Sequence, residues 1–160
     1  DKELILRFAR KGAIAGHRGL GGDLLYPVSA TALEPVEACY VDLDFFKASM
    51  KVNHDFMYEL MMFYAGELKE TERNMRNLVH MPVKNRIAQA LITLQEKFGI
   101  KEDSTIDIEL SRQDFASFVG TTYETVFRML NELVEDKLLN VDGKRITITD
   151  KQKLLELTTL

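Results

Sequence analysis

The stretch that decides the fold runs from Leu110 to Leu139, LSRQDFASFVGTTYETVFRMLNELVEDKLL. It holds two short segments with apolar residues at helical spacing, separated by a glycine and two threonines. Ser111 is placed to cap the first helix, Gly120 allows a sharp turn, and Thr121 or Thr122 can cap the second helix. This spacing predicts a helix-turn-helix. The inward positions are Phe115, Ala116, Val119, Val126, Met129, Leu130 and Leu133.

The second predicted helix projects four side chains from its first turns: Tyr123, Glu124, Phe127 and Arg128. In a helix-turn-helix those turns enter the major groove of DNA. There an arginine can bind guanine through two hydrogen bonds, and a glutamate can accept one from cytosine. Glu124 and Arg128 are also four residues apart, so they could instead form an exposed ion pair worth on the order of a few tenths of a kcal/mol. The two caps and the turn glycine favour the DNA-reading interpretation.

A two-stranded hairpin, or wing, is expected to follow, because Asp142-Gly143 is a strong signal for a tight turn between antiparallel strands. Arg112 on the first helix and Lys144 in the wing are expected to bind DNA phosphates, since basic side chains neutralise them without reading sequence. The predicted DNA-binding residues are Ser111, Arg112, Gln113, Thr121, Thr122, Tyr123, Glu124, Thr125, Arg128 and Lys144.

The composition is that of an ordinary globular protein. Of 160 residues, 46% are hydrophobic and 29% charged, and no apolar run approaches the roughly 20 residues that cross a membrane. The formal net charge is −4, and residues 81–160 carry 11 basic and 13 acidic side chains, so a DNA-binding face must come from local clustering. The N-terminus does not read as a signal peptide, and we expect a cytoplasmic protein without a membrane partner.

Catalytic and metal-binding patterns are missing from the sequence. The histidines His17, His54 and His80 are scattered outside any H-E-x-x-H frame, and Gly19-Leu-Gly-Gly lacks the Lys-Ser/Thr of a phosphate loop. Cys39 is the single cysteine, which excludes an internal disulfide and a four-cysteine iron–sulfur site and suggests a small buried residue. We therefore expect no enzyme and no metal.

A long helix is predicted over residues 54–79, after a short helix near 44–50 and before another near 82–98. Along it, apolar residues recur at alternating spacings of four and three, the pattern of a coiled-coil seam. The seam could pack within the chain, but we favour a homodimer, with Glu67 and other charged residues on the faces left in water. The predicted interface residues are Met57, Met61, Tyr64, Leu68, Thr71, Met75 and Leu78.

Residues 1–43 alternate turn residues with short β-prone runs at 4–9, 28–33 and 38–43, which predicts a small antiparallel β-domain and an α+β protein. The run at 4–9 reads as a strand already in progress, so we expect the chain to begin inside a domain. Unpaired strand edges in this run would need cover from elsewhere.

The stretches Leu110-Ser-Arg-Gln-Asp, Val119-Gly, Glu124-Thr-Val-Phe-Arg128 and Gly143-Lys-Arg resemble the Crp/Fnr family of bacterial regulators. The resemblance continues through Asn85-Arg-Ile-Ala-Gln-Ala-Leu, Thr71 to Leu78 and Lys11-Gly-Ala-Ile-Ala-Gly16, and so covers essentially the whole chain. It implies the C-terminal part of a jelly-roll-like, cyclic-nucleotide-binding-like sensor roll over 1–50, a dimerisation helix over 51–80 and a winged helix-turn-helix over 81–160. The opening strands of the roll are expected to have been truncated or lost.

The effector region departs from the family members that bind cyclic nucleotides. Those members hold the ribose with a glutamate and the phosphate with an Arg-Ser pair, where this chain has His17 and Tyr26-Pro27. These residues cannot reproduce that recognition, so cyclic AMP is not expected, and an unknown small-molecule effector stays open. The candidate pocket residues are Gly16, His17, Arg18, Tyr26, Pro27 and Thr71.

The resemblance also implies partners: double-stranded DNA with a twofold-symmetric operator, a second copy of the chain, and RNA polymerase. The expected function is a dimeric, sequence-specific DNA-binding transcription regulator of the Crp/Fnr type that does not respond to cyclic AMP. The alternative is a ligand-sensing dimer that acts through protein partners and carries a weak or vestigial DNA reader. DNA-binding assays distinguish the two.

Overall fold

The computed structural model describes residues 3–20 and 23–159, which fall into two compact units. One unit is Ala13–Asn74, and the other combines Asp1–Gly12 with Met75–Leu160. We call the first the N-terminal unit and the second, after the helix-turn-helix predicted within it, the reader unit. The helix α2 (His54–His80) contributes its last residues to the reader unit.

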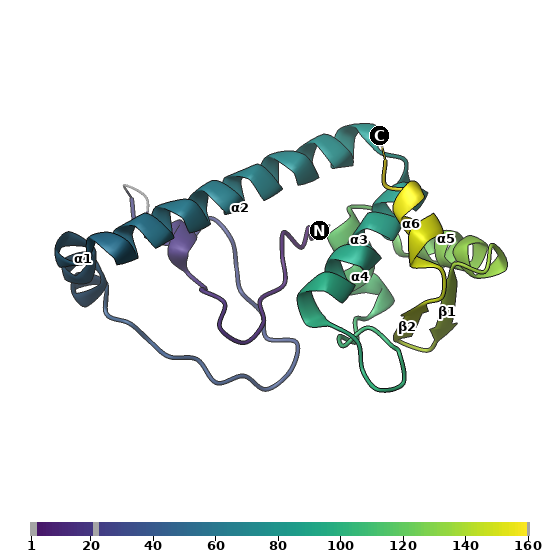
Figure 1. Cartoon of the computed structure of the whole chain (residues 1–160), viewed down its shortest axis with the longest axis horizontal. Coiled ribbons are helices and arrows are strands. Elements are labelled where there is room, and N and C mark those ends of the chain that lie inside the picture. The colour runs from purple at the N-terminus through teal and green to yellow at the C-terminus, as the bar shows by residue number, and fades with distance from the viewer. Residues whose placement is uncertain (1–2, 21–22, 160) are drawn as a thin grey trace. The chain divides into compact units, whose positions relative to one another are not determined.

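The reader unit is a bundle of helices with a two-stranded sheet (Figure 1). Helix α3 packs against three other helices, and strand β1 packs against α5. The two strands are antiparallel, with Leu139 opposite Ile148 and Asp142 opposite Arg145, so the predicted Asp-Gly turn closes the wing. The elements are α3 (Val83–Phe98), α4 (Arg112–Val119), α5 (Tyr123–Glu135), β1 (Leu139–Asp142), β2 (Arg145–Ile148) and α6 (Lys151–Glu156).

The core of the reader unit confirms the inward positions predicted for the helix-turn-helix. Six of the seven are buried and Met129 is half-buried against them. Each fully buried large apolar side chain contributes about 1.5–3 kcal/mol relative to an exposed one, which fixes α4 and α5 on α3. The largest fully buried side chains are Phe115, Ile87, Leu91, Ile92, Leu133, Leu154 and Val126.

The helix ends form as the sequence predicts. The Ser111 hydroxyl accepts a hydrogen bond from the backbone N–H of Asp114 at 3.0 Å and caps α4. Gly120 ends α4 with φ of 73°, a left-handed conformation that favours glycine. Thr122, rather than Thr121, caps α5 by accepting from the N–H of Thr125. These caps fix the turn between α4 and α5.

The N-terminal unit contains the short helix η1 (His17–Leu20), the helix α1 (Leu43–Val52) and the larger part of α2. Asp42 caps α1 by accepting from the backbone N–H of Asp44 at 2.9 Å. Asn53, between the two long helices, accepts from the N–H of Phe56 at 2.9 Å. These local caps explain why the helices predicted near 44–50 and over 54–79 form as two separate helices.

The α+β class is confirmed, but the strands predicted within residues 4–9, 28–33 and 38–43 are wrong. In the described part of the chain, the wing is the one sheet formed by named strands. A β-prone run becomes a strand only when another run pairs with its backbone, and these runs find no such partner. Cys39 is exposed, so the expectation of a buried cysteine is also wrong.

Residues 3–10, which include the first β-prone run, contact helices instead of pairing with another strand. The backbone N–H of Ile5 donates to the carbonyl of Ser117 on α4 at 3.1 Å. Phe8 is buried, with its ring centroid 4.9 Å from that of Phe118. The Arg10 guanidinium donates to the carbonyl of Lys97 at the end of α3. The segment at residues 3–10 is therefore covered by helices of the reader unit, and not by a neighbouring strand.

Candidate nucleic-acid interface

The exposed face of α5 carries the four side chains predicted to project from it. Tyr123 and Phe127 are 44% and 52% exposed, and their rings stack with centroids 6.5 Å apart and planes 11° apart. Glu124 and Arg128 are exposed beside them. Buried Val126 and Leu130 hold the opposite face against the core, so this presentation is fixed by packing.

Glu124 and Arg128, the two charged residues on this face, do not form an ion pair with each other. The structure describes both Glu124 and Arg128, and no ion pair joins them, so the exposed-bridge alternative is not realised. A hydrogen bond from its own backbone N–H, and then one from Thr122, lower the pKa of the Glu124 carboxyl. The Glu124 carboxylate is therefore a hydrogen-bond acceptor at neutral pH. The Arg128 guanidinium has no ion-pair partner among the described residues and keeps its donors available.

Arg112 connects α4 with the wing. Its guanidinium donates to the carbonyl of Gly143 at the turn between β1 and β2. The side chain is half-buried, and burial lowers the pKa of the guanidinium without approaching neutrality. The predicted phosphate ligand thus has a second task, because it also holds the wing turn. Lys144, next to that turn, is exposed.

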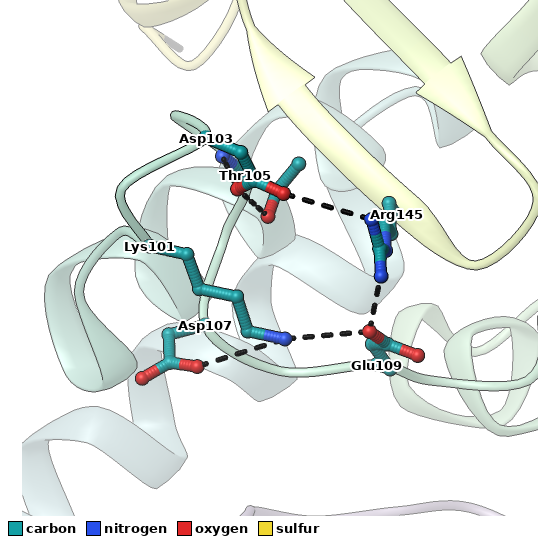
Figure 2. A network of polar contacts seen from close by, with 6 residues as sticks. All are labelled: Lys101, Asp103, Thr105, Asp107, Glu109 and Arg145. Carbon is teal, nitrogen blue, oxygen red and sulfur yellow. Dashed lines mark hydrogen bonds and ion pairs between the residues drawn. The ribbon is translucent and has the colours of Figure 1, made fainter.

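The second wing strand is held by a polar network that the sequence did not reveal (Figure 2). Arg145 lies 3.7 Å from the carboxylate of Asp103 and 3.6 Å from that of Glu109. Lys101 lies 3.3 Å from the same Glu109 carboxylate and 3.9 Å from that of Asp107. The charge of Arg145 is therefore directed at the loop between α3 and α4.

Thr105 orders the acidic end of this network. Its hydroxyl donates to Asp103 at 2.6 Å and its backbone N–H donates to the same oxygen at 3.0 Å (Figure 2). These two bonds, the hydroxyl first, lower the pKa of the Asp103 carboxyl. The carboxylate that faces Arg145 is thus kept ionised and in place. Two basic residues follow Gly143. Arg145 is in this network, whereas Lys144 has no ion-pair partner among the described residues.

The remaining predicted DNA-binding residues lie around the two helix starts. Gln113 is exposed on the first turn of α4, and Ser111 is half-buried in its cap. Thr121 and Thr125 are half-buried, and the hydroxyls of Thr122 and Thr125 are 3.1 Å apart. The structure thus groups these residues near the start of α4 and the α4–α5 turn.

Two of the candidate effector residues, His17 and Arg18, lie against α2 inside the N-terminal unit. His17 is buried, with its Nε2 atom 3.5 Å from the carboxylate of Glu67, and the Arg18 guanidinium lies 3.2 Å from the same oxygen. Tyr64 donates its hydroxyl to the carbonyl of His17 at 2.6 Å, and burial raises the pKa of this phenol. Glu67 was predicted on a water-facing side of the helix and is instead the anionic partner of both basic side chains.

Tyr26 covers the glycines of the same region. An added Cβ at Gly16 would lie 3.3 Å from the Tyr26 ring, and one at Gly19 would lie 2.7 Å from it. Gly16 also has φ of 84°, so it is restricted by both conformation and space. Pro27 and Thr71 are exposed, and the Thr71 hydroxyl donates to the Glu67 carbonyl at 2.8 Å. No group of three metal-ligating side chains occurs within residues 3–20 and 23–159.

The predicted seam of α2 is largely uncovered. Met61 and Leu68 are 57% and 60% exposed, and Met57 and Met75 are exposed on the same side. Two of the predicted seam residues also have contacts within their own unit. Tyr64 bonds to His17, and Leu78 packs on the glycine that ends α4. In the described chain no helix is both long and apolar enough to span a bilayer.

Comparison with known proteins places this geometry in a family. The model of the Crp-like helix-turn-helix domain matches residues 85–157. The cAMP-activated global transcriptional regulator CRP of Pasteurella multocida (strain Pm70) is 30% identical over 149 residues, covering 92% of this chain and 71% of the relative. Its Salmonella typhimurium (strain LT2) counterpart is 32% identical over 152 residues, with the same two coverages. The chain belongs to the Crp/Fnr family of transcription regulators.

Solved Crp/Fnr structures agree with the fold. FixK2 from Bradyrhizobium japonicum superposes with a TM-score of 0.68 at 24% identity, over 75% of this chain and 60% of its own. A Crp/Fnr transcriptional regulator from Thermus thermophilus gives a TM-score of 0.60 at 26% identity, over 65% and 54%. The chain thus spans somewhat more than half of these solved relatives.

The Crp/Fnr relatives are named after different regulatory roles. Besides the cAMP-activated regulators, a global nitrogen regulator of Synechococcus elongatus is 31% identical over 121 residues, covering 74% of this chain and 54% of the relative. Membership of the Crp/Fnr family therefore fixes the class of protein and leaves the effector to be argued from residues.

Proposed function

We propose that this Crp/Fnr chain is a homodimeric, sequence-specific DNA-binding regulator that reads bases with α5. One observation carries the proposal: Glu124 and Arg128 stand exposed and unpaired with each other on a helix whose other face is buried and whose start is capped. Donors and acceptors fixed in this way are what base recognition in a major groove requires. The proposed domains are the sensor remnant over 1–50, the dimerisation helix over 51–80 and the winged reader over 81–160.

Base reading follows from the two charged groups. Arg128 binds O6 and N7 of a guanine, and Glu124 accepts from the amino group of a cytosine on the complementary strand. The family resemblance adds a TGA-like element in each half-site. A twofold-symmetric dimer places the two half-sites about one helical turn apart.

The aromatic pair sets the outer part of the half-site. Tyr123 lies where cyclic-AMP-responsive family members have a guanine-reading arginine, and a phenol cannot make that two-bond contact. Stacked on Phe127, it offers an apolar surface that suits a thymine methyl group. The outer base pair is therefore less constrained, or favours thymine.

Phosphate contacts come from Lys144, and from Arg112 to the extent that its bond to Gly143 leaves donors free. The hydroxyl and amide side chains near the helix starts supply further contacts to the backbone: Ser111, Gln113, Thr121, Thr122 and Thr125. With a net charge of −4, affinity depends on these local groups rather than on global attraction.

Dimerisation is assigned to the exposed seam of α2. The helix has 27 residues and is therefore about 40 Å long, with apolar side chains uncovered along one side. A coiled-coil partner would remove them from water. RNA polymerase as a further partner rests on the family resemblance alone.

Selection of binding sites from random DNA tests the function. The expected result is a twofold-symmetric motif with a G·C pair at a fixed position in each half. A motif without that symmetry would show that α5 is not the reading helix. Failure to enrich any sequence would favour the alternative, a ligand-sensing dimer that acts through protein partners.

A further inference from the structure

Arg86, on the first turn of α3, donates hydrogen bonds to four backbone carbonyls of the reader unit. Its Nε donates to the carbonyl of Val119 at 3.1 Å and its Nη2 to that of Gly120 at 3.3 Å. Its Nη1 donates to the carbonyls of Leu78 at 3.2 Å and Met81 at 3.0 Å. One guanidinium thus joins two segments of backbone that lie far apart in the sequence.

The four acceptors are the groups that helix ends leave without partners. Leu78 and Met81 lie at the end of α2, and Val119 and Gly120 lie at the end of α4, where the last carbonyls have no helical N–H to accept from. Both ends also carry the negative pole of a helix dipole, which favours a cation. A half-buried arginine with donors in a planar fork satisfies both ends at once.

A second contact joins the same two segments. A Cβ added to Gly120 would lie 2.5 Å from Cδ1 of Leu78, so the side chain of Leu78 occupies the space next to this glycine. The turn glycine therefore meets α2 through packing as well as through Arg86. Burial lowers the pKa of the Arg86 guanidinium, yet arginine keeps its charge at any physiological pH.

We infer that Arg86 is the positioning residue that holds the helix-turn-helix in a fixed orientation to the last turn of α2. DNA binding then depends on Arg86 although it lies outside both α5 and the wing. Without it, α2 and α4 each end in unsatisfied carbonyls, and the turn that sets α5 is free to shift against α2. This inference rests on the proposed DNA-reading function.

The test compares Arg86→Lys and Arg86→Met with the control Lys84→Met. Lys84 is also a basic residue of the first turn of α3 and pairs with Asp136 at 2.8 Å at the end of α5, so its loss removes a helix-to-helix ion pair but not the Arg86 bonds. Lysine at position 86 keeps the charge but cannot reach four carbonyls. Hydrogen exchange without DNA, over peptides covering 75–82 and 117–123, is measured beside DNA affinity at several salt concentrations.

Both Arg86 variants are expected to speed exchange in the two peptides together and to weaken every DNA sequence by the same factor, about tenfold. The slope of affinity against salt and the preferred motif should not change. A slope reduced by about one per half-site would show that Arg86 binds a phosphate and would overturn the inference. So would affinity and exchange no different from those of Lys84→Met. If the wild-type protein selects no DNA, the proposed function fails. The exchange rates alone then test whether Arg86 connects the ends of α2 and α4.

Discussion

At the scale of single residues, the groups proposed to read bases differ from the groups that hold the scaffold. Arg128 is exposed without an ion-pair partner in the described chain, whereas Arg112 and Arg145 are directed at the wing turn and the α3–α4 loop. Arginines that look alike in the sequence thus have different tasks. The difference depends on what each guanidinium meets, which sequence spacing does not give.

Arg128→Ala is expected to cost about 1–3 kcal/mol per half-site and to relax the preference at one base pair, because the bidentate contact to guanine is lost. Lys144→Ala is the matched control in the wing. It should weaken all sequences alike and lower the salt slope by about one per half-site. Fluorescence anisotropy with the selected operator and single-base variants provides the measurement. An unchanged motif in Arg128→Ala would refute the assignment.

At the scale of elements, the wing is positioned by ion pairs with the loop before α4 (Figure 2). Exposed ion pairs contribute little stability each, typically about 0.2–1 kcal/mol. Their effect here is on position, since two carboxylates from one loop hold the strand that follows Lys144, the proposed phosphate ligand.

Arg145→Met is therefore expected to lower the free energy of unfolding by less than about 1 kcal/mol. It should weaken DNA binding slightly and leave the salt slope unchanged, because the charge of Arg145 faces Asp103 and Glu109 rather than a phosphate. Chemical denaturation and salt titrations are the measurements. A slope reduced as far as in Lys144→Ala would instead place Arg145 on DNA.

Helix α2 gives the second prediction at this scale. Met61→Asp with Leu68→Asp should produce monomers, because each change would bury an unpaired charge in the seam. Met62→Asp is the control, since Met62 is also exposed but lies off the seam. Sedimentation velocity reports the oligomeric state. A dimer that survives the double change would place the interface elsewhere.

At the scale of the whole molecule, the sequence predicts what is encoded locally. The caps at Ser111 and Thr122, the left-handed Gly120 and the Asp-Gly turn depend on neighbours within a few residues, and all are found. The short helix α6 was missed, because six residues show little periodicity. The strands before residue 43 were wrong because pairing needs a second segment that composition cannot guarantee.

The site residues divide in the same way. The projecting face of α5 followed from helical periodicity, whereas Glu67 was missed because its partners, His17 and Arg18, lie about fifty positions earlier in the chain. The same holds for Arg86, whose acceptors come from two helix ends. Contacts between distant segments depend on the fold, and no local pattern marks them.

The effector region also yields a prediction, which concerns ligand binding. Cyclic AMP is expected not to bind at micromolar concentration, since His17 and Tyr26-Pro27 replace the groups that hold ribose and phosphate, and Arg18 is already bonded to Glu67. Isothermal titration calorimetry should show no saturable heat. Saturable micromolar binding that Arg18→Ala abolishes would establish a nucleotide site here.

The segment at residues 3–10 bears on how the protein folds while it is being made. Ile5 and Ser117 are bonded although 112 positions separate them. At a synthesis rate of about 5–20 residues per second, the ribosome needs about 6–22 seconds to produce the second partner after the first. Until α4 has emerged, Phe8 has no ring to pack on, and its apolar surface is open to chaperones. The core that holds α5 in place is therefore completed only after α4 has been made, although residues 3–10 were made much earlier.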